Sequence, residues 1–504
     1  MDNLILSIYR KACGTLKYKV VRTTKGNTQY KKAPTVEGVL AEETINALKE
    51  LTNHIQDIIY KDVPTSEGIV TIIHSNSLVE KQTLQRTIIV PLCDYIHQIH
   101  QVATPVDLKD FKGIIDKLVG GHTLIYFQQT HQLLSMNTYS APTRAITDTA
   151  TESTVIGPQD AFTESIVTNI SLVRRRIRNP MLKNEDRTVG TKSNVKISIM
   201  YMEDLVNKEK LDTLKQRIDQ VHYPIFTDIS MLMQAIEDNP LSPFPQYYMS
   251  VRPDTISQYL LDGRIVVFMD NSQAAIVCPT SFFEMFVSVE DYYNRWTMAS
   301  LLRMLRFFGF FLTIIITPTY ISALTFHPEI VPYELLLNIQ ESRSKVPFPP
   351  IFEVLFIELI IEVLREAGSR LPTKVGQTIG IVGGIVIGTA AVEAGLVSNI
   401  LIVLVAVSAL LSFLPPLFLM SNTSRFVRYI FIIAAGFFGF YGQMLALAWL
   451  FAHLLNIRSL GTPYMTPVIP RKATDLLDSV IRFPLAYTKG RKGLTKEQKK
   501  VKKL

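Results

Sequence analysis

The chain has 504 residues, of which 47% are hydrophobic and 19% are charged, and its formal net charge is +8. That length allows about three folding units. Much of the positive charge lies in residues 471–504, which hold eleven Lys and Arg against three Asp and Glu. No helix-turn-helix, RNP or zinc pattern accompanies the charge, which argues against a nucleic-acid-binding protein. The three scattered cysteines, Cys13, Cys93 and Cys278, argue against a disulfide framework or a metal cluster.

The first part of the chain predicts a basic arm and an α/β subdomain. Residues 1–35 are basic and polar and have no apolar period, so we expect a flexible arm there. They also lack a continuous apolar stretch, so no cleaved signal peptide is expected. Over 36–136, helix-like runs alternate with β-rich runs such as GIVTIIH and HTLIYF, which predicts the first α/β subdomain. Residues 137–154 are rich in Ser, Thr and Ala, which is typical of a linker.

A second α/β subdomain is predicted over residues 155–302. VKISIMYM (195–202) and RIVVFM (264–269) are its strand candidates, and residues 160–177 are a helix candidate. Asp262 and Gly263 precede the second strand and indicate a turn, because glycine tolerates the positive φ that such turns need.

The segment 303–458 predicts an all-α polytopic transmembrane domain. Phe307–Phe326 is twenty uncharged residues, about the length that crosses a hydrocarbon core of roughly 30 Å. Arg303 and Arg306 come directly before it and place that end on the cytoplasmic side by the positive-inside rule. Arg425 and Arg428 are further candidates for basic residues at the membrane boundary. The expected helices cover residues 307–326, 375–392, 396–420 and 429–456, and a basic cytoplasmic tail follows over 459–504.

One apolar segment, 350–366, is ambiguous because it carries carboxylates. Glu358, Glu362 and Glu366 are spaced by four and share one helical face. Carboxylates inside a bilayer are costly unless they face water or protein. If the N-terminal domain and the tail are both cytoplasmic, the number of crossings is even. This segment is therefore predicted to be an amphipathic or re-entrant helix in preference to a true crossing.

Residues that carry catalysis are not evident. The sequence has no G-x-S-x-G, Walker A or H-E-x-x-H motif and no Cys/His pair at ligand spacing, so neither an enzyme nor a bound metal or cofactor is expected. The run RRRIR (174–178) suits phosphate or lipid head groups, but a solvated or subunit-contacting helix face explains it as well.

A stripe of glycines in the second apolar segment suggests close helix packing. Gly376, Gly380, Gly384 and Gly388 recur every four residues, and small residues let helices approach closely in lipid. In a ring of subunits, the neighbouring apolar side chains could instead line and gate an axial opening. These gate candidates are Ile381, Val382, Ile385 and Val386. Glu393, at the end of the segment, is either a cation-attracting ring position or an interfacial cap.

Several strings of the sequence resemble one known family. They include IGPQDAFTESIVTNISLVRRRIRNPMLK (156–183), FPQ (244–246), RPD (252–254), LLDGRIVVFMDNS (260–272), EDYY (290–293), VPFPPIFE (346–353), LREAGSRLP (364–372), GQTIGIVGGIVIGTAAVEAGLVS (376–398) and SLGTPYMTP (459–467). Together they are similar to the A subunit of GerA-type spore germinant receptors, over residues 155–470. The part before residue 155 departs from the family pattern, since it reads GIVTIIHSNS and TDTATEST where an Arg-containing strand and a Glu-Pro signature are usual. That departure bears on ligand or partner specificity.

The resemblance implies a non-enzymatic subunit of a nutrient sensor in the inner membrane of the bacterial spore. Its partners would be further copies of itself in a ring, a transporter-like B subunit and a lipoprotein C subunit, with the N-terminal domain and tail facing the spore core. The implied activity is a nutrient-gated cation channel, in which the gate candidates and the four carboxylates Glu358, Glu362, Glu366 and Glu393 would act. A non-conducting scaffold subunit and a secondary transporter remain the alternatives.

Overall fold

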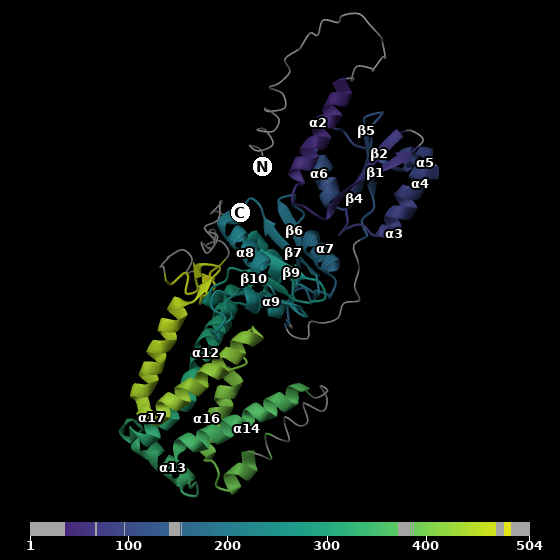
Figure 1. The fold of residues 1–504 in the computed structure, drawn as a ribbon. Helices are drawn as coiled ribbons and strands as arrows, with labels where there is room; N and C mark the ends of the chain where they lie inside the picture. The colour runs from purple at the N-terminus through teal and green to yellow at the C-terminus, as the bar shows by residue number, and fades with distance from the viewer. Residues whose placement is uncertain are drawn as a thin grey trace, which may run out of the picture.

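The computed structural model describes residues 36–65, 68–94, 96–140, 152, 154–370, 384, 386, 388–469 and 478–484. The molecule is elongated, with two α/β subdomains followed along its length by a helical region (Figure 1). This confirms the predicted order of an α/β N-terminal part and a helical C-terminal part. The predicted arm over residues 1–35 lies outside the described residues.

The first subdomain is a five-stranded antiparallel sheet with helices on its faces. Its strands lie in the order β1-β2-β4-β5-β3. Separate groups of buried apolar side chains surround Ile72 and Ile73, which are neighbours in β2, so the sheet is covered on both faces. The elements in chain order are α2 (Val36–Leu51), β1 (Ile58–Thr65), β2 (Gly68–Ser75), α3 (Lys81–Leu84), a π-helical turn (Gln85–Ile89), α4 (Val90–Asp94), α5 (Ile96–Val102), β3 (Thr104–Pro105), α6 (Phe111–Val119), β4 (His122–Phe127) and β5 (Gln132–Asn137).

The second subdomain repeats this plan. Its strands lie in the order β6-β7-β9-β10-β8, so strands at equal places in the two subdomains occupy equal places in the two sheets. The elements are α7 (Ile166–Arg176), β6 (Leu182–Val189), β7 (Val195–Met202), α8 (Lys208–Gln220), α9 (Ile229–Ile236), β8 (Tyr248–Ser250), α10 (Pro253–Leu261), β9 (Ile265–Met269), β10 (Ala275–Cys278), a 3₁₀ turn (Phe282–Phe286) and α11 (Glu290–Tyr293).

The corresponding turns also agree in the two subdomains. Gly121 lies between α6 and β4 with φ +88°, and Gly263 lies between α10 and β9 with φ +83°. Glycine adopts this backbone region without the steric cost that other residues meet. The turn predicted at Asp262 and Gly263 is therefore confirmed, and the same turn recurs in the first subdomain.

A buried ion pair joins the two subdomains. The Arg174 guanidinium lies 2.7 Å from an oxygen of Asp57, and both side chains are at most 7% exposed. Asp57 also accepts hydrogen bonds from Ser75 and Ser77. The first arginine of the RRRIR run is thus a joint between subdomains, whereas Arg175 and Arg178 are exposed.

The helical region begins at α12 and ends beside the second subdomain. Its elements are α12 (Trp296–Thr325), a 3₁₀ turn (Pro328–Ile330), α13 (Tyr333–Arg343), α14 (Pro350–Arg370), α16 (Asn399–Leu411) and α17 (Phe418–Asn456), followed by β11 (Arg458–Ser459) and β12 (Thr462–Pro463). Figure 1 shows the start of α12 and the end of α17 at the second subdomain, with α13 at the opposite end of the molecule. Among the described helices, α12 and α17 are long and apolar enough to cross a membrane, and α16 is a shorter apolar helix.

Three helices differ in extent from the sequence-based expectation. Helix α12 begins at Trp296, eleven residues before the expected start at residue 307. The expected helix over 396–420 is divided, because α16 ends at Leu411 and α17 begins at Phe418, around Pro415 and Pro416. Proline lacks the N–H that a helix interior requires. The expected helix over 429–456 bends inside α17 at Gly439, whose φ of 58° and ψ of −138° are not helical.

No separate boundary divides the second subdomain from the helices. Phe282 and Phe286, from the turn after β10, contact Phe310 of α12 with ring centroids 6.0 and 5.4 Å apart. Their buried apolar cluster continues to Leu450 and Leu454 of α17. The second subdomain and these two helices therefore share one buried apolar core.

Candidate functional site

A buried ion pair connects four helices in the interior of the helical region. Glu358 of α14 and Arg428 of α17 lie 2.8 Å apart, and their side chains are at most 1% exposed. Arg428 also donates to Ser408 of α16 at 2.8 Å, and Glu358 accepts from Thr317 of α12 at 3.3 Å. Because removal of one partner leaves a buried charge uncompensated, such a pair fixes the relative position of its helices.

A second, more accessible pair extends this group. Glu362 of α14 contacts Arg425 of α17 and lies 3.4 Å from Arg365. Arg365 stacks over the ring of Phe413 at 4.6 Å and donates to Ser412, which directly precedes Phe413. We call Glu358, Glu362, Arg365, Arg425 and Arg428 the charge cluster. It fastens α14 to α17 and to the loop between α16 and α17.

The predicted cation-attracting carboxylates have different surroundings. Glu358 and Glu362 face three arginines, so the charge cluster has a formal charge of +1. Glu366 pairs with Arg370 at 2.5 Å on the exposed side of α14. Glu393 is exposed, and no hydrogen bond or ion pair joins its side chain to another described residue. A cation-attracting role stays a prediction for all four, and Glu393 has the surroundings that suit it best.

The predicted gate segment is only partly described. Gly380, Ile381, Val382 and Ile385 lie outside the described residues. Val386 is 56% exposed. A Cβ atom added at Gly384 or Gly388 would meet no described atom within 4 Å. This part of the glycine stripe is therefore not covered by any described residue.

The predicted boundary arginines Arg303 and Arg306 lie within α12 and pair with carboxylates of the protein. Arg303 is fully buried and lies 3.2 Å from Asp291 and 2.8 Å from Asp478. Arg306 pairs with the same Asp291 at 2.8 Å. Arg482 donates to the backbone carbonyl of Asp291 at 2.7 Å. These residues, the neck network, join α11, α12 and residues 478–484, and their pairing accounts for charges that the sequence alone assigned to the membrane surface.

The chain after α17 is part of the soluble fold. Ser459 donates to the carbonyl of Gln246, and Tyr464 donates to the carbonyl of Pro245, at 2.7 and 2.6 Å. Tyr464 is fully buried. The segment predicted as the start of the basic cytoplasmic tail therefore packs against the second subdomain, where the strings FPQ and SLGTPYMTP meet.

A carboxyl group with a shifted pKa lies beside this contact. Burial raises the pKa of Glu237 to about 7, against the opposing effect of a hydrogen bond from the backbone N–H of Gln246. The negative charge of Asp238 raises it further. This group lies in the soluble part and titrates near neutral pH.

The sequence singled out several of these arginines as boundary residues but did not reveal their carboxylate partners, and it did not single out Asp291, Asp478 or Arg365 at all. The contacts of Asp291, Asp478 and Arg365 are made with residues of other elements, so the sequence around each of them does not reveal its role. A signal was present, because the strings EDYY and LREAGSRLP contain two of them. A charged residue that lies within a string typical of the family was therefore the one sequence signal for a polar contact between elements.

Comparisons with known proteins show which family the chain belongs to. Residues 46–494 match the family model described as Bacillus/Clostridium GerA spore germination protein. The chain is 39% identical to spore germination protein GerQA of Bacillus cereus over 461 residues, covering 89% of this chain and 92% of the relative. It is 34% identical to spore germination protein KA of Bacillus subtilis (strain 168), covering 94% and 90%.

A solved structure also aligns with part of the chain. The N-terminal domain of the A subunit of the Bacillus megaterium spore germinant receptor GerK3 covers 48% of this chain and 95% of its own, at 22% identity and a TM-score of 0.37. The assignment does not depend on this likeness. The family model covers most of the chain, and two relatives exceed 30% identity over nearly their full length. The chain therefore belongs to the GerA family of spore germination proteins.

Proposed function

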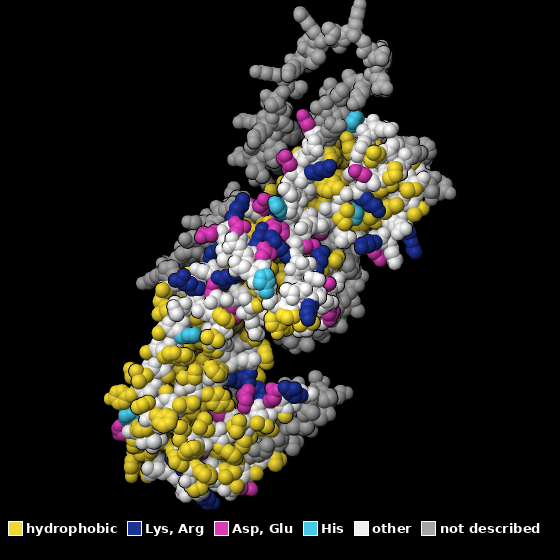
Figure 2. All heavy atoms as spheres, viewed as in Figure 1, with side chains coloured by type: hydrophobic (Ala, Val, Ile, Leu, Met, Phe, Trp, Pro, Cys, Tyr) yellow, Lys and Arg dark blue, Asp and Glu magenta, His cyan; other side chains and the backbone are white. Residues whose placement is uncertain are grey.

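We propose that this chain is the membrane-spanning A subunit of a nutrient-sensing germinant receptor and that it forms a cation-conducting ring. The observation that carries the proposal is the exposed apolar surface of the helical region. Phe308 is 55% exposed, Phe437 is 69% exposed and Tyr441 is 72% exposed. Figure 2 shows apolar side chains gathered over the helices and charged ones over the α/β part. Soluble monomers rarely expose such large apolar areas, and lipid would cover this one.

The arrangement of the helices supports an even number of membrane passages. The start of α12 and the end of α17 both adjoin the second subdomain through the neck network and Tyr464. At the opposite end, a Cβ at the bend residue Gly439 would lie 2.9 Å from Phe326, which follows α12. Helix α17 thus runs out and back. This geometry fits a multi-pass protein of the spore inner membrane with both termini facing the core.

The open glycine face supports assembly with further copies. Gly384, Gly388 and Val386 contribute an accessible surface of small and apolar side chains, which suits close helix contact in lipid or an axial constriction. The transporter-like B subunit and the lipoprotein C subunit would complete the receptor. Nutrient binding would open the ring by favouring the open arrangement over the closed one.

The charge cluster favours one alternative, a subunit that holds the receptor together without conducting. Its arginines outnumber its carboxylates, which does not suit a path for cations. Purified full-length protein in planar bilayers separates the two functions. Stepwise currents carried by K⁺ or Na⁺ support the channel, and an electrically silent protein that still assembles with its partner subunits supports the scaffold.

The gate residues give a sharper test of the channel. Val386→Ala is expected to widen or wet the constriction and to cause ion release without nutrient, as is Val382→Ala. Val403→Ala is the matched control, because Val403 is a valine of similar exposure, 61%, that belongs to α16 and not to the glycine-stripe segment. Ion retention is measured in dormant spores that carry each variant. Equal retention in Val386→Ala, Val382→Ala and the control would remove these residues from the gate.

A further inference from the structure

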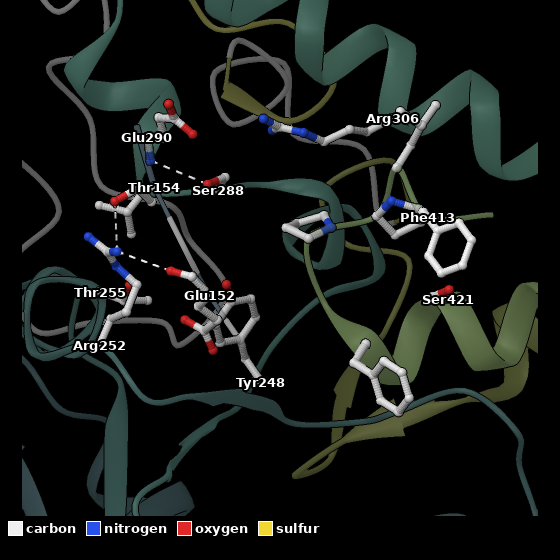
Figure 3. A pocket seen from close by; sticks show the side chains of 15 residues that line it. Glu152, Thr154, Tyr248, Arg252, Thr255, Ser288, Glu290, Arg306, Phe413 and Ser421 are labelled. Atoms are coloured by element: carbon white, nitrogen blue, oxygen red, sulfur yellow. Dashed lines mark hydrogen bonds between the residues drawn. The ribbon is translucent and has the colours of Figure 1, made fainter. Parts of the chain in front are cut away.

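A cleft lies between the second subdomain and the loop that joins α16 to α17. Its volume is about 340 Å³, within the range of small-ligand sites. Figure 3 shows polar side chains of the second subdomain on one wall and the apolar side chains of the loop on the other. The cleft thus presents two kinds of surface to whatever enters it.

Two charged groups of the cleft are available, the guanidinium of Arg306 from α12 and the carboxylate of Glu290, because the other lining carboxylate, Glu152, already accepts from Ser250 and the backbone N–H of Val251. Arg252 is not available, because its donors reach Asp254, Thr154 and two backbone carbonyls. Arg306 uses only Nη1, toward Asp291 and the carbonyl of Phe286, so its Nε and Nη2 have no bond to another described residue. The Glu290 carboxylate likewise has no hydrogen bond or ion pair within the described chain. In Figure 3 these two side chains lie at the same end of the cleft.

The apolar wall continues the surface that lipid would cover. Phe413 is 60% exposed and Phe418 is 72% exposed, and both line the cleft. Leu305 and Phe308 of α12, on the same helix as Arg306, are 49% and 55% exposed. A ligand that satisfies both walls must carry charged groups at one end and apolar chains at the other.

We propose that this cleft binds the head group of a membrane phospholipid that carries both a phosphate and a primary ammonium group. The phosphate would accept hydrogen bonds from Arg306, which presents its donors in a planar fork. The ammonium would pair with Glu290, and the acyl chains would extend past Phe413 and Phe418. This inference rests on the proposed function, since the helices must lie in a membrane for lipid to reach the cleft.

The bound lipid would act on the charge cluster through one shared side chain. Phe413 lines the cleft, and the guanidinium of Arg365 from α14 stacks over its ring, 4.6 Å from the ring centroid. A head group that fixes Phe413 would therefore also fix Arg365 and its partner Glu362. The cleft would in this way connect the lipid at the membrane surface to the packing of α14.

The test measures lipid retention by the full-length protein. Native mass spectrometry and thermal unfolding are compared in phosphatidylethanolamine, phosphatidylglycerol and phosphatidylcholine, and with inorganic phosphate alone. We expect retention and stabilisation to be strongest with phosphatidylethanolamine, by about three- to fivefold in affinity, the size of one partly exposed ion pair. Glu290→Gln should abolish that preference. Phe418→Ser should weaken the binding of all three lipids.

Glu334→Gln is the matched control, because Glu334 is an exposed glutamate in the first turn of α13, whereas Glu290 is a half-buried glutamate in the first turn of α11 that lines the cleft. Equal affinity of the native protein for the three lipids would overturn the proposal. So would an unchanged preference in Glu290→Gln, or protection by inorganic phosphate as strong as that by lipid. Alkaline carbonate extraction distinguishes a failure of the cleft proposal from a failure of the proposed function. A protein that stays in the membrane pellet without lipid preference contradicts only the cleft, whereas release to the supernatant contradicts the proposed function.

Discussion

At the scale of single residues, opposite charges buried between elements hold the molecule in one arrangement. Arg174 meets Asp57 between the subdomains, and Arg303 meets Asp291 at the neck. Arg428 meets Glu358 among the helices. Each pair joins residues that are distant in the chain or belong to different elements. The helical spacing of Glu358, Glu362 and Glu366 was visible in the sequence, but their arginine partners were not, because the spacing says nothing about the facing helix.

The buried pair in the charge cluster gives the first prediction at this scale. Glu358→Gln is expected to destabilise the protein by about 3–5 kcal/mol, because it leaves the Arg428 charge buried without a counter-charge. The double variant Glu358→Leu with Arg428→Met should recover most of this loss. The measurement is thermal unfolding in detergent. Glu366→Gln is the control, since its pair with Arg370 is largely exposed and should contribute less than about 1 kcal/mol. Similar effects of Glu358→Gln and Glu366→Gln would contradict the structural role of the cluster.

Glu237 predicts a dependence of stability on pH. Its folded-state pKa of about 7 lies above the ordinary 4.5, so the folded protein keeps a proton that the unfolded chain releases in this interval. Its stabilising contribution is therefore complete below about pH 4.5 and is lost as the pH rises through 7.

Glu237→Gln isolates this effect, because the amide stays neutral at every pH. Unfolding temperatures of the native protein and of Glu237→Gln are compared from pH 4.5 to 8. The native protein should lose stability relative to the variant as the pH rises. Parallel pH profiles would show that the carboxyl at the FPQ contact does not titrate in this range.

At the scale of elements, strands with regular apolar patterns were predictable, whereas the bend within α17 and the ribbon β11–β12 were not. The strand predicted at 195–202 matches β7 (Val195–Met202), and the one at 264–269 differs from β9 by one residue. Alternating or continuous apolar residues between turn signals define such strands well. The bend at Gly439 was missed because it falls within an uninterrupted apolar stretch, FFGFYG, where composition is uniform. The ribbon β11–β12 was missed because it needs partners about two hundred residues earlier in the chain.

The bend of α17 gives a prediction at this scale. Gly439→Ala is expected to destabilise the protein by about 1–3 kcal/mol, because its backbone conformation disfavours a side chain and the added Cβ would lie 2.9 Å from Phe326. Gly368→Ala in α14 is the matched control, since its Cβ would meet no described atom within 4 Å. That change should be neutral or stabilising by up to about 1 kcal/mol. Loss of stability in the control but not in Gly439→Ala would argue against the out-and-back path of α17.

At the scale of the whole molecule, two α/β subdomains with the same strand order are joined to a bundle of apolar helices through a shared buried core. The order of α/β and helical parts was predictable from the distribution of charge along the chain. The duplication of the two sheets was not predicted, because it is expressed in strand order and turn geometry. The return of the chain to the second subdomain after α17 was also missed, since the basic residues after 471 suggested a cytoplasmic tail from residue 459 onward. Both features bear on function, because they place the start of α12 and the end of α17 beside the same subdomain.

The most direct test of this account is the sidedness of two single cysteines in sealed membrane vesicles. Leu241→Cys lies in the second subdomain, where residue 241 is 99% exposed. Glu329→Cys lies at the opposite end of the helices, where the Glu329 side chain is 69% exposed. A membrane-impermeant maleimide is added to vesicles of known orientation, and the labelled peptides are identified by mass spectrometry. The account predicts that the two cysteines react from opposite sides of the membrane. Labelling of both from the same side would contradict it.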